Sequence, residues 1–102
     1  DEKESRFDLL LFLGSVYYNT KRINEAIKIY EDLMARFPER SKAENVPMNI
    51  IVCYEELELF DKAIDGLKKL RETYTNQEFI DLKVKRLEQR RANLPGSRGL
   101  RK

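Results

Sequence analysis

The chain contains an internal repeat with a spacing of 37 residues. Shifting the sequence by this spacing places residues 16–33 on residues 53–70. Large side chains fall on large ones and small on small: Tyr17 on Tyr54, Ala26 on Ala63, Ile27 on Ile64 and Leu33 on Leu70. A repeat of this length is typical of a structural unit that cannot bury its apolar face alone and stacks on its neighbour. The repeat therefore predicts one stacked domain, which a chain of 102 residues can accommodate.

Each copy carries the apolar spacing of two amphipathic helices. In the first copy, apolar residues recur every three or four positions on either side of a polar turn at 19–22: Leu10, Leu13, Val16 and Tyr17 before it, and Ile27, Tyr30, Leu33, Met34 and Phe37 after it. This spacing predicts two helices. Pro38 ends the second helix, because the residue before a proline disfavours the helical conformation. We expect Leu10, Leu13 and Tyr17 to pack on the second helix.

The second copy predicts a third and a fourth helix. With Asn45 as the N-cap, Pro47 falls in the first turn, where its missing N–H is tolerated. The third helix then runs from about Val46 to Leu57, after a separate turn at 41–44. The fourth helix runs from Asp61 to about Thr73.

A fifth helix follows the second copy. Thr75 with Glu78 three residues later fits a capping box. The apolar stripe behind it consists of Phe79, Ile80, Val84, Leu87 and Leu94. The chain is therefore predicted to be all-α with five helices, and we expect residues 95–102 to form a flexible basic tail.

The pattern resembles the tetratricopeptide repeat (TPR) family. In the first copy the signature positions are occupied by Leu10, Leu13, Gly14, Tyr17, Ala26, Tyr30, Leu33 and Pro38. The resemblance implies helix-turn-helix repeats stacked in a right-handed superhelix. The domain would span residues 1–94, with repeat one at 7–40, repeat two at 44–75 and a C-terminal capping helix at 76–94. The long period resembles that of bacterial cell-envelope TPR proteins, which favours the periplasm or cell envelope over the cytoplasm.

The residue types argue against catalysis. The chain has no histidine, so it lacks a His-based triad, general base or metal site. No glycine-rich phosphate loop is present, and adjacent acidic pairs point to different helix faces. The single cysteine, Cys53, forms no intrachain disulfide, and we expect it to be a small buried apolar residue. We predict no enzyme activity, no cofactor and no metal.

The resemblance implies a concave groove that binds a peptide or helix of a partner protein. In the family, the first helix of each repeat lines this groove. The implied residues are Asp8, Leu11, Phe12, Ser15, Tyr18 and Asn19; Asn45, Met48, Asn49, Val52, Glu55 and Glu56; and Leu82, Lys85, Arg86 and Gln89. Asn49 and Arg86 match two positions of the family's carboxylate clamp. Leu11 and Ser15 stand where that clamp needs Lys and Asn, so the clamp is incomplete.

Two alternative functions remain open. Helix one is apolar nearly all round, and such a helix is normally covered on more than one side. Leu9, Phe12 and Val16 would then contact a second copy of the chain in a homodimer, or a missing repeat if the chain is a C-terminal piece of a larger TPR protein. The other alternative is a nucleic-acid or membrane-surface adaptor. Residues 79–102 hold eight basic and two acidic side chains, but basic helices with one buried stripe are common, and we rank this alternative last.

Overall fold

A computed structural model describes residues 1–95 of the chain, and these residues form helices and turns without a strand. The predicted tail at 95–102 lies outside the described residues, apart from its first residue. The helices are α1 (Glu2–Asn19), α2 (Ile23–Arg36), α3 (Pro38–Ala43), α4 (Val46–Glu56), α5 (Phe60–Arg71) and α6 (Gln77–Ala92). The all-α fold built from TPR-like helix pairs is confirmed.

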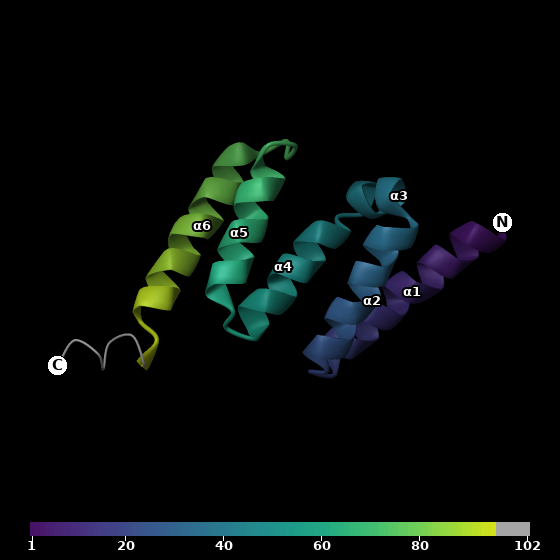
Figure 1. Cartoon of the computed structure of the whole chain (residues 1–102), viewed down its shortest axis with the longest axis horizontal. Coiled ribbons are helices and arrows are strands. Elements are labelled where there is room, and N and C mark those ends of the chain that lie inside the picture. Colours follow the sequence, from purple (N-terminus) through teal and green to yellow (C-terminus); the bar gives the residue numbers. More distant parts are fainter. Residues whose placement is uncertain (96–102) are drawn as a thin grey trace.

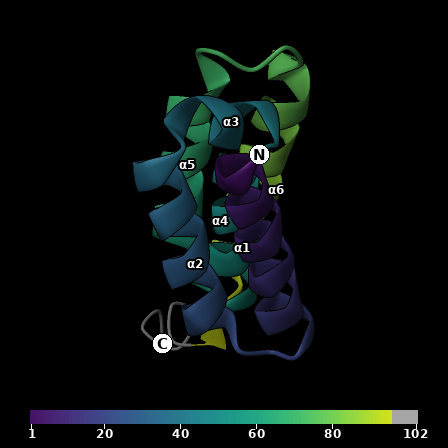
Figure 2. The same cartoon turned by 90° about the vertical axis from the view of Figure 1, so that its right-hand side faces the viewer.

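The helices lie side by side in chain order along the long axis of the molecule (Figure 1). Seen along that axis, α1, α4 and α6 form one layer, and α2 and α5 form the other (Figure 2). The pairs α1 with α2, α2 with α4, α4 with α5, and α5 with α6 are in contact. Each helix therefore touches mainly its neighbours in the chain, as expected for a stacked repeat.

The core consists of two apolar clusters that meet in α4. The first cluster joins α1 and α2 to Val46 and Cys53 of α4. The second cluster joins α5 and α6 to Ile51 of α4. All three residues of α4 are at most 3% exposed. Because burial of apolar surface is the main favourable term in folding, α4 is the element that ties the two halves together.

Helix α1 begins earlier and packs differently than the sequence predicts. Asp1 caps it, accepting a hydrogen bond from the Glu4 backbone N–H at 3.0 Å. The buried residues of α1 are Phe7 and Gly14. Leu10 and Tyr17 pack on the first cluster as predicted. The prediction for Leu13 is wrong, since its side chain is 37% exposed. The buried face is centred on Phe7 and Gly14, which lie about two helical turns apart and therefore on the same side of α1.

The connection between the two repeats contains a helix that the sequence did not predict. Pro38 ends α2 and also opens α3, occupying the first turn, where proline is favoured. Ser41 is fully buried and donates a hydrogen bond to the Leu33 carbonyl oxygen at 2.9 Å. Phe37 contacts the Phe7 ring edge-on, with centroids 5.6 Å apart. The described residues thus hold six helices rather than five, because residues 41–43 of the predicted turn belong to a six-residue helix and Glu44 is its C-cap.

The N-caps of α4 and α6 also differ from their predictions. Asn45 stands at the N-cap of α4, but its φ of 62° is left-handed and its side chain makes no capping hydrogen bond. In α6 the cap is Asn76 rather than Thr75. Its Oδ1 atom accepts from the Phe79 backbone N–H at 3.0 Å. Both asparagine and threonine cap helices well, so the residue types alone could not decide between neighbouring positions.

Candidate functional site

A hollow of about 490 Å³ lies between α1 and α4. Seven residues that the sequence assigned to the partner-binding groove line it: Asp8, Leu11, Phe12, Ser15, Tyr18, Asn49 and Val52. Tyr30 and Glu44 complete the lining. The spacing explains this convergence, because residues three, four and seven apart lie on one face of a helix. The hollow combines an apolar floor with carboxylates at its edge.

A second hollow of about 630 Å³ continues along the same side of the molecule toward α6. The two hollows share Tyr18 and Val52, so together they form one groove across the α1, α4 and α6 layer. We call this surface the concave groove. Its second half is lined in addition by Glu55, Glu56, Leu57, Glu58, Lys83 and Arg90.

Glu55 sits between α4 and α6 in an ion-pair cluster. Its Oε2 atom lies 3.3 Å from Lys83 Nζ, and its Oε1 atom lies 3.9 Å from Arg90. The Oε2 atom is buried and accepts no hydrogen bond from the described residues. A carboxylate in this position is costly unless its charge is compensated. Lys83 and Arg90 of α6 provide that compensation, and the three side chains together form a charged side of the groove.

Tyr18 connects the two halves of the groove. Its hydroxyl donates to Glu56 Oε1 at 3.4 Å. Partial burial, followed by the nearby Glu56 carboxylate, raises the pKa of Tyr18 above its usual value. The phenol therefore stays neutral over the physiological range, where it offers an aromatic face and a hydroxyl to a ligand.

The outer end of the groove is held by Arg40 of α3. Its guanidinium lies 2.8 Å from Asp8 Oδ1, 4.0 Å from Glu44 and 4.3 Å from the centre of the Phe7 ring. It also donates to the Glu4 carbonyl oxygen at 3.3 Å. A planar guanidinium suits several simultaneous partners of this kind. Helix α3 thus helps to position the Asp8 edge of the groove.

The remaining predicted groove residues lie elsewhere. Asn19 is exposed at the end of α1 and lines neither half of the groove. Asn45 lines a different hollow, on the other side of α4. Lys85, Arg86 and Gln89 are exposed on α6 and also line neither half.

The spacing between repeats becomes shorter before α6, so a shift of 37 residues gives the wrong register for that helix. A shift of 37 residues relates α1 to α4, but a shift of 34 relates α4 to α6: it places Val46 on Ile80 and Cys53 on Leu87, all buried. With this shift, Lys83 takes the position of Asn49. Arg86 and Gln89 take the positions of Val52 and Glu55 but line neither half of the groove. The sequence analysis did not assign Lys83 and Arg90 to the groove. The alignment of Ile80 with Val46 and of Leu87 with Cys53 would have indicated the 34-residue shift and therefore these two positions.

The outer face of α1 carries an exposed apolar stripe. Leu9 is 69% exposed, Phe12 67%, Leu13 37% and Val16 36%. Shifted by 37 residues, Leu9 falls on Val46 and Val16 on Cys53, and both of those residues are fully buried. In repeat two, the corresponding face is covered by helix α2. In repeat one, the described residues leave it open.

Three further properties concern the single thiol, metal ligands and membrane spans among the described residues. Cys53 is fully buried as predicted, and burial raises the pKa of its thiol to about 11. Residues 1–95 contain no group of three or more His, Cys, Asp or Glu residues that would hold a metal ion. None of the described helices is long and apolar enough to cross a membrane.

The fold and the groove together define a helical repeat protein built from stacked antiparallel helix pairs. Residues 8–40 match the Tetratricopeptide repeat family, so α1, α2 and the start of α3 form a repeat of that type. Modules of this family are generally protein–protein interaction modules without catalytic activity. No curated protein and no solved structure matches the chain.

Proposed function

We propose that this protein binds a peptide or helix of a partner protein in the concave groove, without catalysing a reaction. The observation that supports this function is the convergence of residues from α1 and α4 on one continuous hollow. Leu11, Phe12 and Val52 supply apolar surface, and a groove of this kind recognises an extended segment or a helix by shape and side-chain contacts.

The charges around the groove indicate the kind of segment that fits. Carboxylates of Asp8, Glu44, Glu55, Glu56 and Glu58 outnumber the cations of Arg40, Lys83 and Arg90 along it. Like charges at an interface oppose binding, and opposite charges favour it. We therefore expect the preferred ligand to carry apolar side chains flanked by lysine or arginine.

Selection from a phage-displayed random peptide library tests the proposal. We expect the selected peptides to combine apolar and basic residues and to bind the protein in a fluorescence anisotropy titration. Ser15→Arg fills the groove from α1, where Ser15 bonds only to the Phe12 carbonyl oxygen within its own helix. This variant should raise the Kd at least about tenfold.

Gln89→Arg is the matched control, because it adds the same side chain to an exposed position outside the groove. It should leave the Kd unchanged. Peptides that bind Ser15→Arg as tightly as the unmodified protein would place the binding site elsewhere and refute the proposal.

We propose self-association through α1 as a second function. The stripe of Leu9, Phe12, Leu13 and Val16 is self-complementary in an antiparallel helix pair, and its equivalents Val46 and Cys53 are buried against a helix in repeat two. Stable interfaces bury about 800 Å² on each partner, more than a four-residue stripe offers. We therefore expect a dimer that dissociates on dilution.

Sedimentation velocity over a concentration series tests this second function. The sedimentation coefficient should rise with concentration for the unmodified protein and stay constant for Leu9→Glu. A chain that remains monomeric throughout the series would argue against a homodimer and would leave α1 to contact a helix from a different protein or segment.

We rank nucleic-acid or membrane binding behind these two functions. A location in the bacterial cell envelope stays a prediction from the repeat length. Lys83 and Arg90 of α6 pair with Glu55, and Arg91 pairs with Asp61 at 2.5 Å. These pairs reduce the positive charge that α6 presents to phosphate groups.

A further inference from the structure

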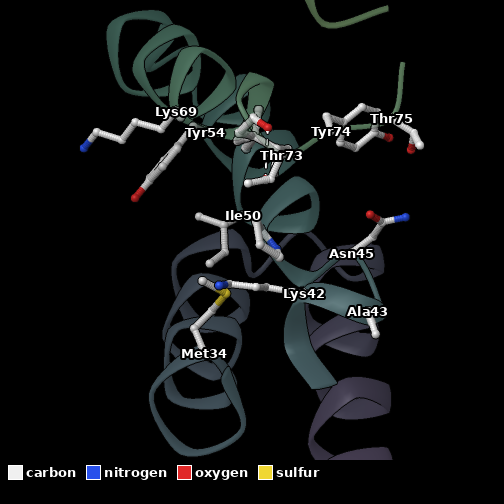
Figure 3. A pocket seen from close by; sticks show the side chains of 14 residues that line it. Met34, Lys42, Ala43, Asn45, Ile50, Tyr54, Lys69, Thr73, Tyr74 and Thr75 are labelled. Atoms are coloured by element: carbon white, nitrogen blue, oxygen red, sulfur yellow. Dashed lines mark hydrogen bonds between the residues drawn. The ribbon is translucent and has the colours of Figure 1, made fainter. Parts of the chain in front are cut away.

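The most voluminous of the described hollows, about 830 Å³, lies on the side of α4 opposite the concave groove. Helix α4 presents Asn49 and Val52 to the groove and Ile50 and Tyr54 to this second hollow. Residues four apart on a helix share a face, and Ile50 and Tyr54 are four apart. We call this surface the α2–α5 hollow, because its lining reaches from Met34 of α2 to Lys69 and Leu70 of α5, with Lys42 and Ala43 of α3 beside Met34 (Figure 3).

The floor and walls of the α2–α5 hollow are mainly apolar. Ile50 and Tyr54 form the floor, Met34 contributes from α2, and Leu70 contributes from α5. These residues are only partly buried by the two core clusters. The cluster contacts thus leave apolar surface available on each of them, which is the usual character of a site that binds an apolar side chain.

Gly66 lets α5 approach α4 closely beside the hollow. A Cβ atom on Gly66 would lie 2.9 Å from Ile51 Cγ1, so α5 can approach α4 closely here only without a side chain. Gly66 lines the hollow.

The charges of the α2–α5 hollow are all positive. Lys42 of α3 and Lys69 of α5 are the charged residues that line it, and no Asp or Glu is among its described lining residues. Neither lysine forms an ion pair within residues 1–95. Figure 3 shows them on opposite walls, with Tyr54 and Ile50 between them. The concave groove, in contrast, carries an excess of carboxylates.

We propose that the α2–α5 hollow is a second binding site, for a short protein segment that carries one or two bulky apolar side chains beside carboxylates. The apolar side chains contact Ile50, Tyr54 and Met34, and the carboxylates pair with Lys42 and Lys69. Two cations beside an apolar floor disfavour basic segments through charge repulsion, and the cost of desolvation at the floor disfavours purely polyanionic ligands. Because the two sites carry opposite charge, each selects a different partner.

A fluorescein-labelled decapeptide with the core Asp-Leu-Phe-Asp-Leu is a suitable probe. Anisotropy titration of the full chain should show saturable binding, and a peptide with asparagine in place of each aspartate should bind at least about tenfold more weakly. The double variant Lys42→Glu with Lys69→Glu should weaken binding of the acidic peptide by at least the same factor. The neutral pair Lys42→Gln with Lys69→Gln should give an intermediate loss.

Two controls separate this site from the concave groove and from generic anion binding. Val52→Arg alters the groove on the other side of α4 and should not weaken binding of the acidic peptide. A peptide with alanine in place of its Leu and Phe residues should bind poorly although it keeps both carboxylates. Lys42 and Lys69 are exposed and Val52 is half-buried. Circular dichroism verifies the helicity of all three variants.

The proposal is overturned if the Lys42→Glu and Lys69→Glu pair binds the acidic peptide like the unmodified chain, or if the alanine peptide binds equally well. The second result would indicate an anion site of the kind that also attracts RNA or lipid headgroups. Amide chemical shifts add an independent criterion: the peptide should shift Ile50, Tyr54 and Leu70 more than Ser15 or Phe12, and the reverse pattern would also refute the site.

Discussion

Gly14 of α1 lies against the ring of Tyr30 of α2 so closely that a Cβ atom on residue 14 would stand 2.5 Å from Tyr30 Cε1. In repeat two the sizes are exchanged: the large Ile51 of α4 contacts the small Gly66 of α5. Each helix pair thus places one glycine against one large side chain, but on opposite helices. Close packing of this kind tolerates little added volume.

Replacing Gly14 with alanine should destabilise the protein. Alanine favours a helix by about 1 kcal/mol over glycine, but the ring of Tyr30, only 4% exposed, must move. Overpacking typically costs about 1–3 kcal/mol, so we expect a net loss in the free energy of unfolding measured with urea. The variant Gly14→Ala with Tyr30→Leu relieves the clash and should recover part of that loss. A stabilised Gly14→Ala single variant would show that the contact is loose.

Truncation of Phe7 should be far more damaging than truncation of Leu13. Phe7 is fully buried and contacts both Phe37 and Arg40, whereas Leu13 is 37% exposed. We expect Phe7→Ala to lower the free energy of unfolding by about 3–5 kcal/mol and Leu13→Ala by clearly less. Thermal unfolding of both variants, followed by circular dichroism, provides the comparison. Equal losses in the free energy of unfolding would show that Leu13 is part of the core after all.

Mutation can show whether Asn76 or Thr75 is the N-cap of α6. Asn76 accepts a hydrogen bond from the Phe79 backbone N–H, so Asn76→Ala leaves this donor without its partner. Loss of such a cap costs about 1 kcal/mol. Thr75→Ala should cost little in the same urea titration. If Thr75→Ala were the more damaging change, the helix would begin one residue earlier in solution.

Stability should fall at alkaline pH through Cys53. Burial raises the pKa of its thiol from 9.0 to about 11. The folded state therefore holds the proton more tightly than the unfolded state, so the stabilisation is complete below pH 9 and is lost as the pH rises through about 11. Burial also raises the pKa of Tyr30, which acts in the same direction.

Urea titrations between pH 8 and 11 measure this dependence, and Cys53→Ala should flatten it without abolishing it, because Tyr30 remains. A thiol reagent at pH 8 gives a second readout. It should modify Cys53 slowly in the folded protein and rapidly in urea, since the thiol is fully buried. Rapid modification of the folded chain would contradict the burial of α4.

Much of the fold could be predicted from the sequence because helix spacing and the internal repeat are local properties. These two properties predicted α1, α2, α4, α5 and α6, and most of the predicted helix ends lie within a few residues of the observed ones. A helix of six residues such as α3 has too little periodicity to show itself. The exposure of Leu13 depends on the exact rotation of α1 against α2, which Gly14 and Phe7 determine jointly.

The groove was partly predictable for a related reason. The residues of α1 and α4 came from the copies that share the 37-residue spacing, and seven of them line one hollow. The assignments on α6 assumed that the same spacing continues, whereas the shorter connection after α5 brings Lys83, rather than Arg86, to the position of Asn49. The α2–α5 hollow depends on contacts between different helices, such as Ile51 with Gly66, and the apolar spacing within one helix does not reveal such contacts.

The position of α4 in both core clusters has a consequence for how the molecule opens. Fraying of α1 exposes only the first cluster and fraying of α6 only the second, so each end can detach while the other half stays folded. Exchange of the α4 amide protons with solvent requires both clusters to be lost. We therefore expect the slowest amide hydrogen exchange in the middle of the chain, with protection decreasing toward both ends.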